Sequence, residues 1–268
     1  GQKDSYENLY TFLFSMYCFE FNNHCTCMAL KDNNNIILGR NSDFLVELEK
    51  LYMNCLYKLN NVYSFNGNTT AFVEMEDGIN EYGLAIGLTF IYPKIINIGL
   101  NAGMIVRYLL EKCKTTDEAI ENLKTLPIAS QQTLTIADST GNIVIVECNS
   151  KDIEVIKPNE DGNFVTIANE FNSQSMRKYN NYNIDNWKAK ERYEVAYNSL
   201  KRNKNNFSVE LVKEVLSGKY GFMCQYDRKT NADTVWSVIY DTKNKRIYRV
   251  EGNPSRKKFK EDKRLKFS

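Results

Sequence analysis

The order in which strand-like and helix-like segments follow one another most limits the fold of this chain. Strand-like runs come first, followed by two helical segments, more strands, a second pair of helices and two final strands. The expected strands are 26–31, 36–41, 70–75, 84–91, 132–137, 142–148, 152–156, 164–168, 234–242 and 246–251, and the expected helices are 102–113, 116–126, 186–201 and 209–217. Such blocks favour an α+β fold of stacked antiparallel sheets flanked by helix pairs, because a doubly wound parallel sheet needs alternating strands and helices.

The chain reads as one domain over residues 25–268, because no linker-like stretch and no internal repeat divides it. No window approaches the roughly 18 apolar residues of a membrane span, so we expect no membrane span. Residues 255–268 carry seven Lys or Arg. This composition predicts a solvated basic tail, and a docking site for acidic partners is the alternative.

Charge, histidine and cysteine content exclude several classes of function. The 35 Lys or Arg and 33 Asp or Glu leave a net charge of +2, without the concentrated basic field of a nucleic-acid binder. The single histidine, His24, excludes a His-rich metal site and an HExxH protease helix. The seven cysteines include no CxxC pair. We therefore expect no metal, no cofactor and a reducing, cytoplasmic compartment.

The turn-forming run 32–35 predicts a hairpin whose strands carry candidate catalytic residues. With the centre of the turn placed at Asn34, Cys25 lies directly across from Asp43. A carboxylate there raises the pKa of the thiol, so Asp43 suits a protonated amine better. That amine is the α-amine of Cys25 itself if the chain begins there. Its usual pKa of about 7.7–8.0 lets it act as a general base near neutral pH.

Arg40 would add positive charge that favours the thiolate of Cys25. Strict alternation puts Arg40 on the opposite face from Asp43, so this site requires a bulge at Gly39 or Asn41. The hairpin geometry alone leaves two alternatives open, a catalytic hairpin and a plain structural one.

Seven stretches of the chain together resemble a family of enzymes. They are CTCMA at 25–29, GRNSDF at 39–44, DGINEYGL at 77–84, ADSTGNIVIVE at 137–147, TIAN at 166–169, TVWSVIYD at 234–241 and YRVEGNP at 248–254. In this order they are similar to N-terminal-nucleophile (Ntn) linear amide hydrolases, which include choloylglycine hydrolases, penicillin V acylases and the isopenicillin N acyltransferase group. The last two stretches resemble the acyltransferase branch.

The resemblance implies an αββα sandwich and a mechanism. The thiolate of Cys25 attacks the carbonyl of a linear amide, its own amine shuttles the proton, and a thioester forms. The family roles map onto Asp43, which holds the α-amine, and Arg40, which lies beside the thiol. They map also onto Asn169, in the oxyanion hole, and Arg192, a further active-site arginine. A solvated arginine on a helix flank is the alternative for Arg192.

One position departs from the family pattern. Bile salt hydrolases have Asn where this chain has Thr89. The backbone N–H of Thr89 would still serve the oxyanion hole, but the side-chain amide is lost. Bile salts are therefore less expected as substrates than those of the acylase-like or acyltransferase-like branches.

Cys25 must be N-terminal to work in this mechanism, so residues 1–24 are expected to be a pro-segment that is cleaved at the His24–Cys25 bond. The aromatic run of Tyr10, Phe12, Phe14, Tyr17 and Phe19 would fill the substrate cleft until cleavage. Because the chain begins with Gly1 rather than Met, we expect a fragment boundary there, and secretion stays open.

Three functions remain open. The leading one is an autoprocessed cysteine amidohydrolase that cleaves a small-molecule N-acyl amide. The second is an acyltransferase that moves an acyl group from a CoA thioester or an acyl amide to an amine. The third is a binding protein without catalysis on the same fold. We expect no nucleic-acid partner, and the sequence leaves homo-oligomerisation and the identity of the acyl group open.

Overall fold

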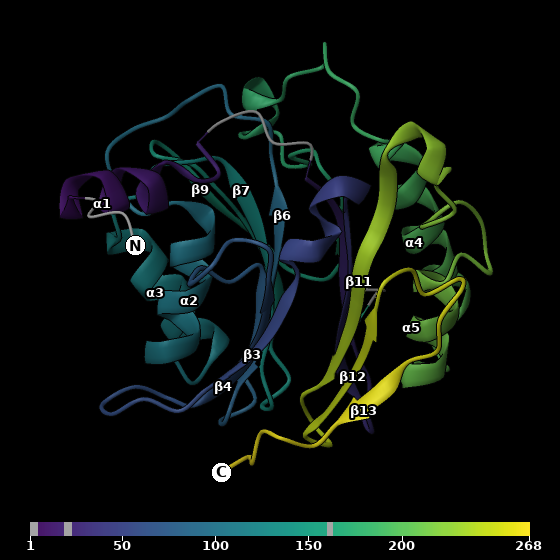
Figure 1. The fold of residues 1–268 in the computed structure, drawn as a ribbon. Helices are drawn as coiled ribbons and strands as arrows, with labels where there is room; N and C mark the ends of the chain where they lie inside the picture. The colour runs from purple at the N-terminus through teal and green to yellow at the C-terminus, as the bar shows by residue number, and fades with distance from the viewer. Residues whose placement is uncertain (1–4, 19–22, 160–162) are drawn as a thin grey trace.

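The protein is described here by a computed structural model that covers residues 5–18, 23–159 and 163–268. Two antiparallel sheets lie face to face, and a pair of helices covers the outer face of each (Figure 1). These four layers are the αββα sandwich that the sequence predicts, and they confirm the α+β fold class.

The first sheet contains the predicted hairpin. Within the described residues it has six strands in the order β10-β1-β2-β11-β12-β13. Their bounds are β10 (Phe164–Ile167), β1 (His24–Lys31), β2 (Ile36–Leu45), β11 (Ala232–Asp241), β12 (Arg246–Glu251) and β13 (Lys260–Asp262). The central strands β1, β2 and β11 are buried almost throughout, which places the hairpin in the middle of the molecule.

The second sheet follows chain order. Its described strands run β3-β4-β5-β6-β7-β8-β9. The bounds are β3 (Met53–Tyr57), β4 (Phe65–Thr69), β5 (Asp77–Asn80), β6 (Ala85–Phe90), β7 (Gln132–Ala137), β8 (Ile143–Cys148) and β9 (Ile153–Ile156). Strands β5 and β6 lie opposite the hairpin and supply groups to the site described below.

Two helix pairs form the outer layers (Figure 1). Helices α2 (Ala102–Lys112) and α3 (Thr116–Thr125) cover the seven-stranded sheet, and α4 (Ala189–Arg202) and α5 (Val209–Leu216) cover the six-stranded sheet. The side chain of Thr115 caps α3 by accepting the N–H of Glu118.

The space between the sheets is filled by apolar side chains from both. Leu38, Trp236 and Val238 of one sheet pack with Ile79 and Ile145 of the other. Burying each aliphatic side chain of this size contributes about 1.5–3 kcal/mol to folding.

At one point the two sheets come very close to each other. A Cβ on Gly87 would lie 2.6 Å from Sγ of Cys27 and 3.3 Å from Cδ of Arg40. Glycine at position 87 therefore lets β6 approach the hairpin beside the candidate site.

The expected strand at 70–75 is wrong, because this segment forms a turn. Phe72 has a left-handed φ of 56°, and the N–H of Glu74 donates to the carbonyl of Ala71 at 3.0 Å. The helix expected from residue 186 begins instead at Ala189. The cause is again left-handed backbone, at Trp187 and Lys188.

The basic segment 255–268 is packed on the domain, although its lysines and arginines are exposed as expected. Residues 260–262 form strand β13, which pairs with β12. Leu265 is only 5% exposed, and Phe267 packs against the core between the sheets. The lysines and arginines project from a segment that its apolar residues anchor.

Residues before Cys25 include a helix at the edge of the molecule. Helix α1 (Tyr6–Ser15) has no buried residue, and it lies beside the α2–α3 layer (Figure 1). The chain becomes buried at Tyr17 and Cys18, and again from Asn23 onward. The described part of residues 1–24 thus lies along one flank of the domain.

Candidate active site

The hairpin pairs in a register one residue away from the predicted one. His24 lies across from Asp43, and Cys25 lies across from Ser42. The reason is the turn: the N–H of Asp32 donates to the carbonyl of Asn35 at 2.9 Å, so the centre falls between two residues and not on Asn34. The prediction that Cys25 faces Asp43 is therefore wrong.

This register removes the need for a bulge in β2. Arg40 pairs with Cys27, and β1 alternates its side chains, so Arg40 lies on the same face as Cys25. The pairing of β1 with β2 runs without a break from His24 to Lys31, and the predicted bulge at Gly39 or Asn41 is absent from this ladder. Asp43 lies on the opposite face.

Arg40 is fully buried and connects the thiol to the second sheet. Its Nη2 atom lies 2.9 Å from Sγ of Cys25, and its Nε donates to the carbonyl of Leu88 at 2.7 Å. Ion pairs join it to Asp77 at 2.8 Å and to Glu76 at 3.4 Å. Burial is tolerated because all three nitrogens of the guanidinium have polar partners.

The thiol of Cys25 is buried and protonated in this state. Burial raises its pKa to about 12, although the nearby charge of Arg40 acts in the opposite direction. The thiol donates to Oδ1 of Asn23 at 3.3 Å, and Nδ2 of Asn23 donates to Glu76 at 3.1 Å. The residue two positions before Cys25 therefore covers its sulfur.

Asn169 reaches the backbone of Cys25. Strand β10 pairs with β1 through Ile167 opposite Cys27, and two further residues in this register place Asn169 opposite Cys25. Oδ1 of Asn169 accepts the N–H of Cys25 at 3.0 Å, and its Nδ2 donates to the carbonyl of Phe90 at 2.9 Å.

Arg192 is also buried, which excludes a solvated arginine on a helix flank. Its Nη1 donates to the carbonyl of Cys25 at 2.7 Å and to Oγ1 of Thr26 at 2.8 Å. Its Nη2 donates to Oδ1 of Asn169 at 2.8 Å. Arg192 and Asn169 thus hold the two peptide groups that flank the Cα atom of Cys25.

The loop before α4 orients Arg192. The carbonyls of Asn186 and Trp187 accept from its guanidinium at 3.0 and 2.9 Å. The ring of Trp187 stacks on His24 with 4.5 Å between ring centroids. Burial lowers the pKa of His24 to about 3, so its ring is neutral.

Asp43 lies beside this arginine on the outer face of the sheet. Its oxygens accept from Thr234 at 2.6 Å and from Tyr226 at 2.9 Å, and Nη1 of Arg192 is 3.8 Å away. Burial raises the pKa of Asp43 to about 6, and the charge of Arg192 acts against that rise. The register keeps its carboxylate near the backbone of residues 24 and 25 rather than beside the thiol.

Thr89 lies between two residues that contact the site. Its neighbours Leu88 and Phe90 supply the carbonyls bound by Arg40 and Asn169. Its own Oγ1 is buried and has no hydrogen-bond partner among the described residues.

The N-terminal segment forms one wall of a cavity whose other wall belongs to the domain. The cavity has a volume of about 260 Å³ and is lined on one side by Tyr17 and Asn23 and on the other by Phe44, Ala71 and others. Of the predicted aromatic run, Tyr10, Phe12 and Phe14 are exposed and Tyr17 is buried. Phe19 lies outside the described residues.

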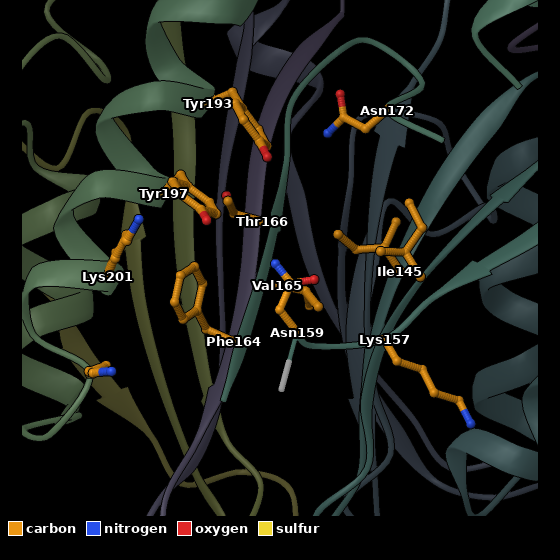
Figure 2. Close-up of a pocket in the computed structure, with 12 residues that line it drawn as sticks. Ile145, Lys157, Asn159, Phe164, Val165, Thr166, Asn172, Tyr193, Tyr197 and Lys201 are labelled. Atoms are coloured by element: carbon orange, nitrogen blue, oxygen red, sulfur yellow. The ribbon is translucent and has the colours of Figure 1, made fainter. Parts of the chain in front are cut away.

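A second cavity of about 440 Å³ opens where β10, β8 and β9 approach α4 (Figure 2). Tyr193 and Tyr197 line it from α4, and Val165 and Thr166 from β10 (Figure 2). None of the predicted site residues lines it.

All seven cysteines lie in the described part of the chain, and none is in a disulfide. Over the described residues, His, Cys, Asp and Glu side chains form no group of three that could hold a metal ion. Within the same residues, no helix combines the length and the apolar character that crossing a bilayer requires.

Residues 29–256 match the family described as acyl-coenzyme A:6-aminopenicillanic acid acyl-transferase. The match extends over most of the 268 residues. The chain belongs to this family. No curated protein matches it in sequence.

Solved structures of Ntn hydrolases share the fold of this acyl-transferase family member. A Caenorhabditis elegans ortholog of N-acylethanolamine-hydrolyzing acid amidase has a TM-score of 0.61 at 19% identity, over 82% of this chain and 93% of that one. Penicillin V acylase from Agrobacterium tumefaciens has a TM-score of 0.60 at 15% identity, over 85% of this chain and 82% of that one. A mutant conjugated bile acid hydrolase from Clostridium perfringens has a TM-score of 0.59 at 15% identity, over 91% of this chain and 98% of that one.

Several site residues were not identified from the sequence. Glu76 directly precedes the DG motif, and Thr234 begins one of the seven stretches, so both lay beside recognised signals. Asn23 and Tyr226 lie in loops whose sequences carry no periodic pattern, and Trp187 lies where a helix was expected.

Proposed function

We propose that the protein is an autoprocessed cysteine amidohydrolase whose nucleophile is Cys25. The observation that carries the proposal is the set of contacts to both backbone groups and the thiol of this one residue. Asn169 accepts its N–H, Arg192 binds its carbonyl and Arg40 contacts its sulfur. These contacts hold the nitrogen, the carbonyl and the sulfur of Cys25 in fixed positions, which a residue that reacts through both its nitrogen and its sulfur requires.

In self-cleavage, Sγ of Cys25 attacks the carbonyl carbon of His24. The S–C bond forms, the C–N bond to Cys25 breaks, and the thiol proton passes to the departing nitrogen. Water then hydrolyses the thioester, which releases residues 1–24 with a new carboxylate and leaves Cys25 with a free amine and thiol.

In the processed enzyme the free amine is the general base. It accepts the thiol proton while Sγ attacks a substrate amide, and it donates the proton to the leaving amine as the C–N bond breaks. Arg40 stabilises the thiolate, and the side-chain amide of Asn169 supports the oxyanion. Asp43, held by Thr234 and Tyr226, stabilises the protonated amine. The backbone N–H of Thr89 is a second oxyanion donor in this scheme.

Residues 1–24 act as a pro-segment in this proposal. Asn23 contacts the sulfur, and Tyr17 is buried in the domain. Substrate therefore reaches Cys25 only after these residues move.

Intact mass spectrometry tests the proposal. Wild-type protein is expected to yield a species that lacks residues 1–24, and Cys25→Ala is expected to remain whole. Cys27→Ala is the matched control, because this thiol is buried on the same strand and burial raises its pKa to about 12 as well. Cleavage in Cys25→Ala, or full amidase activity of uncleaved wild type, would disprove the mechanism. Failure of Cys25 in processed protein to react with an electrophilic lactone would favour a binding protein without catalysis.

A second candidate function, acyl transfer from a CoA thioester, is favoured by the cleft of Figure 2. Lys157, Lys201 and Lys204 line it, and its lining includes no Asp or Glu among the described residues. Such a cleft suits the phosphates of CoA, and β10 leads from it to Asn169.

Product analysis with an acyl-CoA, with and without acceptor amines, separates transfer from hydrolysis. Transfer through this cleft predicts that Lys201→Ala raises KM for the acyl-CoA and leaves KM for acyl amides unchanged. Lys124→Ala, on the distant helix α3, is the control. Equal effects on both donors would argue against a CoA site in this cleft.

A further inference from the structure

Asp77 is a fully buried carboxylate that accepts four hydrogen bonds between the two sheets. Its Oδ2 accepts from Nη1 of Arg40 and from Nε1 of Trp236, both at 2.8 Å. Its Oδ1 accepts from Nδ2 of Asn68 and from the hydroxyl of Tyr240, both at 2.6 Å. A carboxylate has about four acceptor positions, so these donors fill all of them.

The position of the Asp77 carboxylate is determined from both sheets. Trp236 and Tyr240 project from β11 of one sheet, and Asn68 belongs to β4 of the other. Burial, followed by the charge of Asp77, raises the pKa of Tyr240 well above its ordinary value, so its hydroxyl remains a donor. The ring of Trp236 is held in turn by stacking on Tyr52, with 5.1 Å between ring centroids.

Arg40 is anchored at two of its nitrogen atoms, which orients the third. Its Nε donates to the carbonyl of Leu88 at 2.7 Å, and its Nη1 donates to Asp77. Because a guanidinium is planar, these two contacts determine the direction of Nη2, which lies 2.9 Å from Sγ of Cys25. Gly87 leaves room for the stem of Arg40, since a Cβ there would lie 3.3 Å from Cδ.

A second carboxylate competes for the same guanidinium. Oε2 of Glu76 lies 3.4 Å from Nη2 of Arg40, the atom that contacts the sulfur, whereas Asp77 holds Nη1 at 2.8 Å. If Asp77 no longer bound Nη1, Glu76 would be the one carboxylate left within ion-pair distance among the described residues, and the guanidinium would turn toward it. Burial raises the pKa of the Cys25 thiol to about 12, and the charge of Arg40 acts against that rise. Such a turn would therefore leave the thiolate less stable.

We propose that Asp77 is a positioning residue of the reaction, which holds the guanidinium of Arg40 against the sulfur of Cys25 in self-cleavage and in the processed enzyme alike. This inference rests on the proposed function. All four donors to Asp77 lie outside residues 1–24, so release of the pro-segment leaves this arrangement in place. Glu76 differs, because it binds Asn23 of the pro-segment.

Positioning and direct charge predict opposite effects of Asp77→Asn. The negative charge of Asp77 by itself disfavours a thiolate nearby, so a direct charge effect would make the variant cleave faster. An amide accepts with only one atom, so the substitution leaves some of the four donors without an acceptor and loosens Arg40. If positioning decides, the variant cleaves more slowly.

Self-cleavage of the full chain is followed by intact mass over time. Asp77→Asn is expected to slow it roughly 10–100-fold, as loss of hydrogen bonds to a charged group does. Asp138→Asn is the matched control, because Asp138 is also fully buried and accepts four hydrogen bonds, from Thr116, Thr140 and Asn142. The control is expected to cleave at nearly the wild-type rate. A rate in Asp77→Asn equal to or above that of wild type overturns the inference.

Tyr240→Phe is a milder variant that removes one donor to Asp77 and keeps the carboxylate and its ion pair with Arg40. It is expected to slow self-cleavage roughly threefold, in the same direction as Asp77→Asn. It decides the question if Asp77→Asn fails to fold, because an unchanged rate in Tyr240→Phe then overturns the inference.

The ionisation of Cys25 gives a readout that a purely structural role would not change. Processed protein is isolated after prolonged incubation, and alkylation of Cys25 by iodoacetamide is measured by peptide mass as a function of pH. The midpoint is expected to rise by about one pH unit in Asp77→Asn, since a tenfold loss of thiolate corresponds to that shift. An unchanged or lower midpoint overturns the inference.

Arrested self-cleavage in folded Asp77→Asn supports the inference, and Tyr240→Phe then supplies the processed protein for alkylation. Wild type that cleaves itself while both variants behave like it refutes the positioning role alone. Wild type that never cleaves itself refutes the proposed function and this inference with it.

Discussion

The buried carboxyl of Glu74 predicts a measurable pH dependence of stability. Its pKa rises from 4.5 to about 8 in the folded chain, mainly through burial. A raised folded pKa means that the folded state holds a proton which the unfolded state has already lost. The resulting stability is fully present below pH 4.5 and disappears as the pH rises through 8.

The size of the effect follows from the shift. Each pH unit below the folded pKa is worth about 1.36 kcal/mol, so at about pH 6.5 the protonated carboxyl contributes about 2 kcal/mol, and at about pH 8.5 almost nothing. Glu74→Gln has no proton to lose. The gap in unfolding free energy between the two proteins should therefore change by about 2 kcal/mol over this range.

Urea unfolding at the two pH values measures this gap. Both proteins carry Cys25→Ala, so that Tyr17 stays in place beside Glu74. Ionisation of the buried thiols and of other shared groups cancels in the difference. Glu121→Gln, an exposed substitution on α3, should leave the gap at zero at both pH values. A gap that does not change with pH in Glu74→Gln would show that Glu74 is already ionised at about pH 6.5, which would refute the burial argument.

Three further outcomes are expected. Asn169→Ala should slow self-cleavage by about tenfold, because the N–H of Cys25 loses the acceptor that orients the scissile peptide. Intact mass over time measures the rate, and cleavage at the wild-type rate would remove Asn169 from the mechanism. Leu265→Ala should lower the unfolding free energy by about 2–4 kcal/mol in urea, whereas a solvated tail would give less than about 0.5. His24→Phe keeps the ring stacked on Trp187 and should be cleaved within about threefold of the wild-type rate, since both ring nitrogens of His24 lack hydrogen-bond partners among the described residues. Arrested cleavage in His24→Phe would make the histidine a general base.

The layered fold could be predicted because it depends on hydrophobic periodicity, which the sequence displays directly. Strands β4 and β5 were missed because much of their buried surface is polar, and β3 because none of its residues is fully buried. Asn68 of β4, for example, donates to Asp77 at 2.6 Å and to Tyr240 at 3.2 Å inside the protein. A strand that carries a buried polar network lacks the apolar alternation by which strands are recognised.

The candidate site could be predicted in its residue types and not in its geometry. The family stretches identified Cys25, Arg40, Asp43 and Asn169, but the faces they occupy depend on a hairpin register that shifts with a single turn residue. The loop contacts of Trp187 depend on two consecutive left-handed residues, and no residue type at those positions indicates this conformation.

The ionisation states around the His24–Cys25 bond explain why activity should follow cleavage. A thiol with a pKa of about 12 supplies almost no thiolate at neutral pH, which a single self-cleavage tolerates and repeated turnover does not. Burial is the main cause of that pKa, and Arg40 already contacts the sulfur, so little further stabilisation is available from within the site. Displacing Asn23 and Tyr17 would expose the thiol to water and release the α-amine as a base in the same event. The proposed pro-segment would thus suppress catalysis through the dielectric environment of the thiol as well as by blocking access to it.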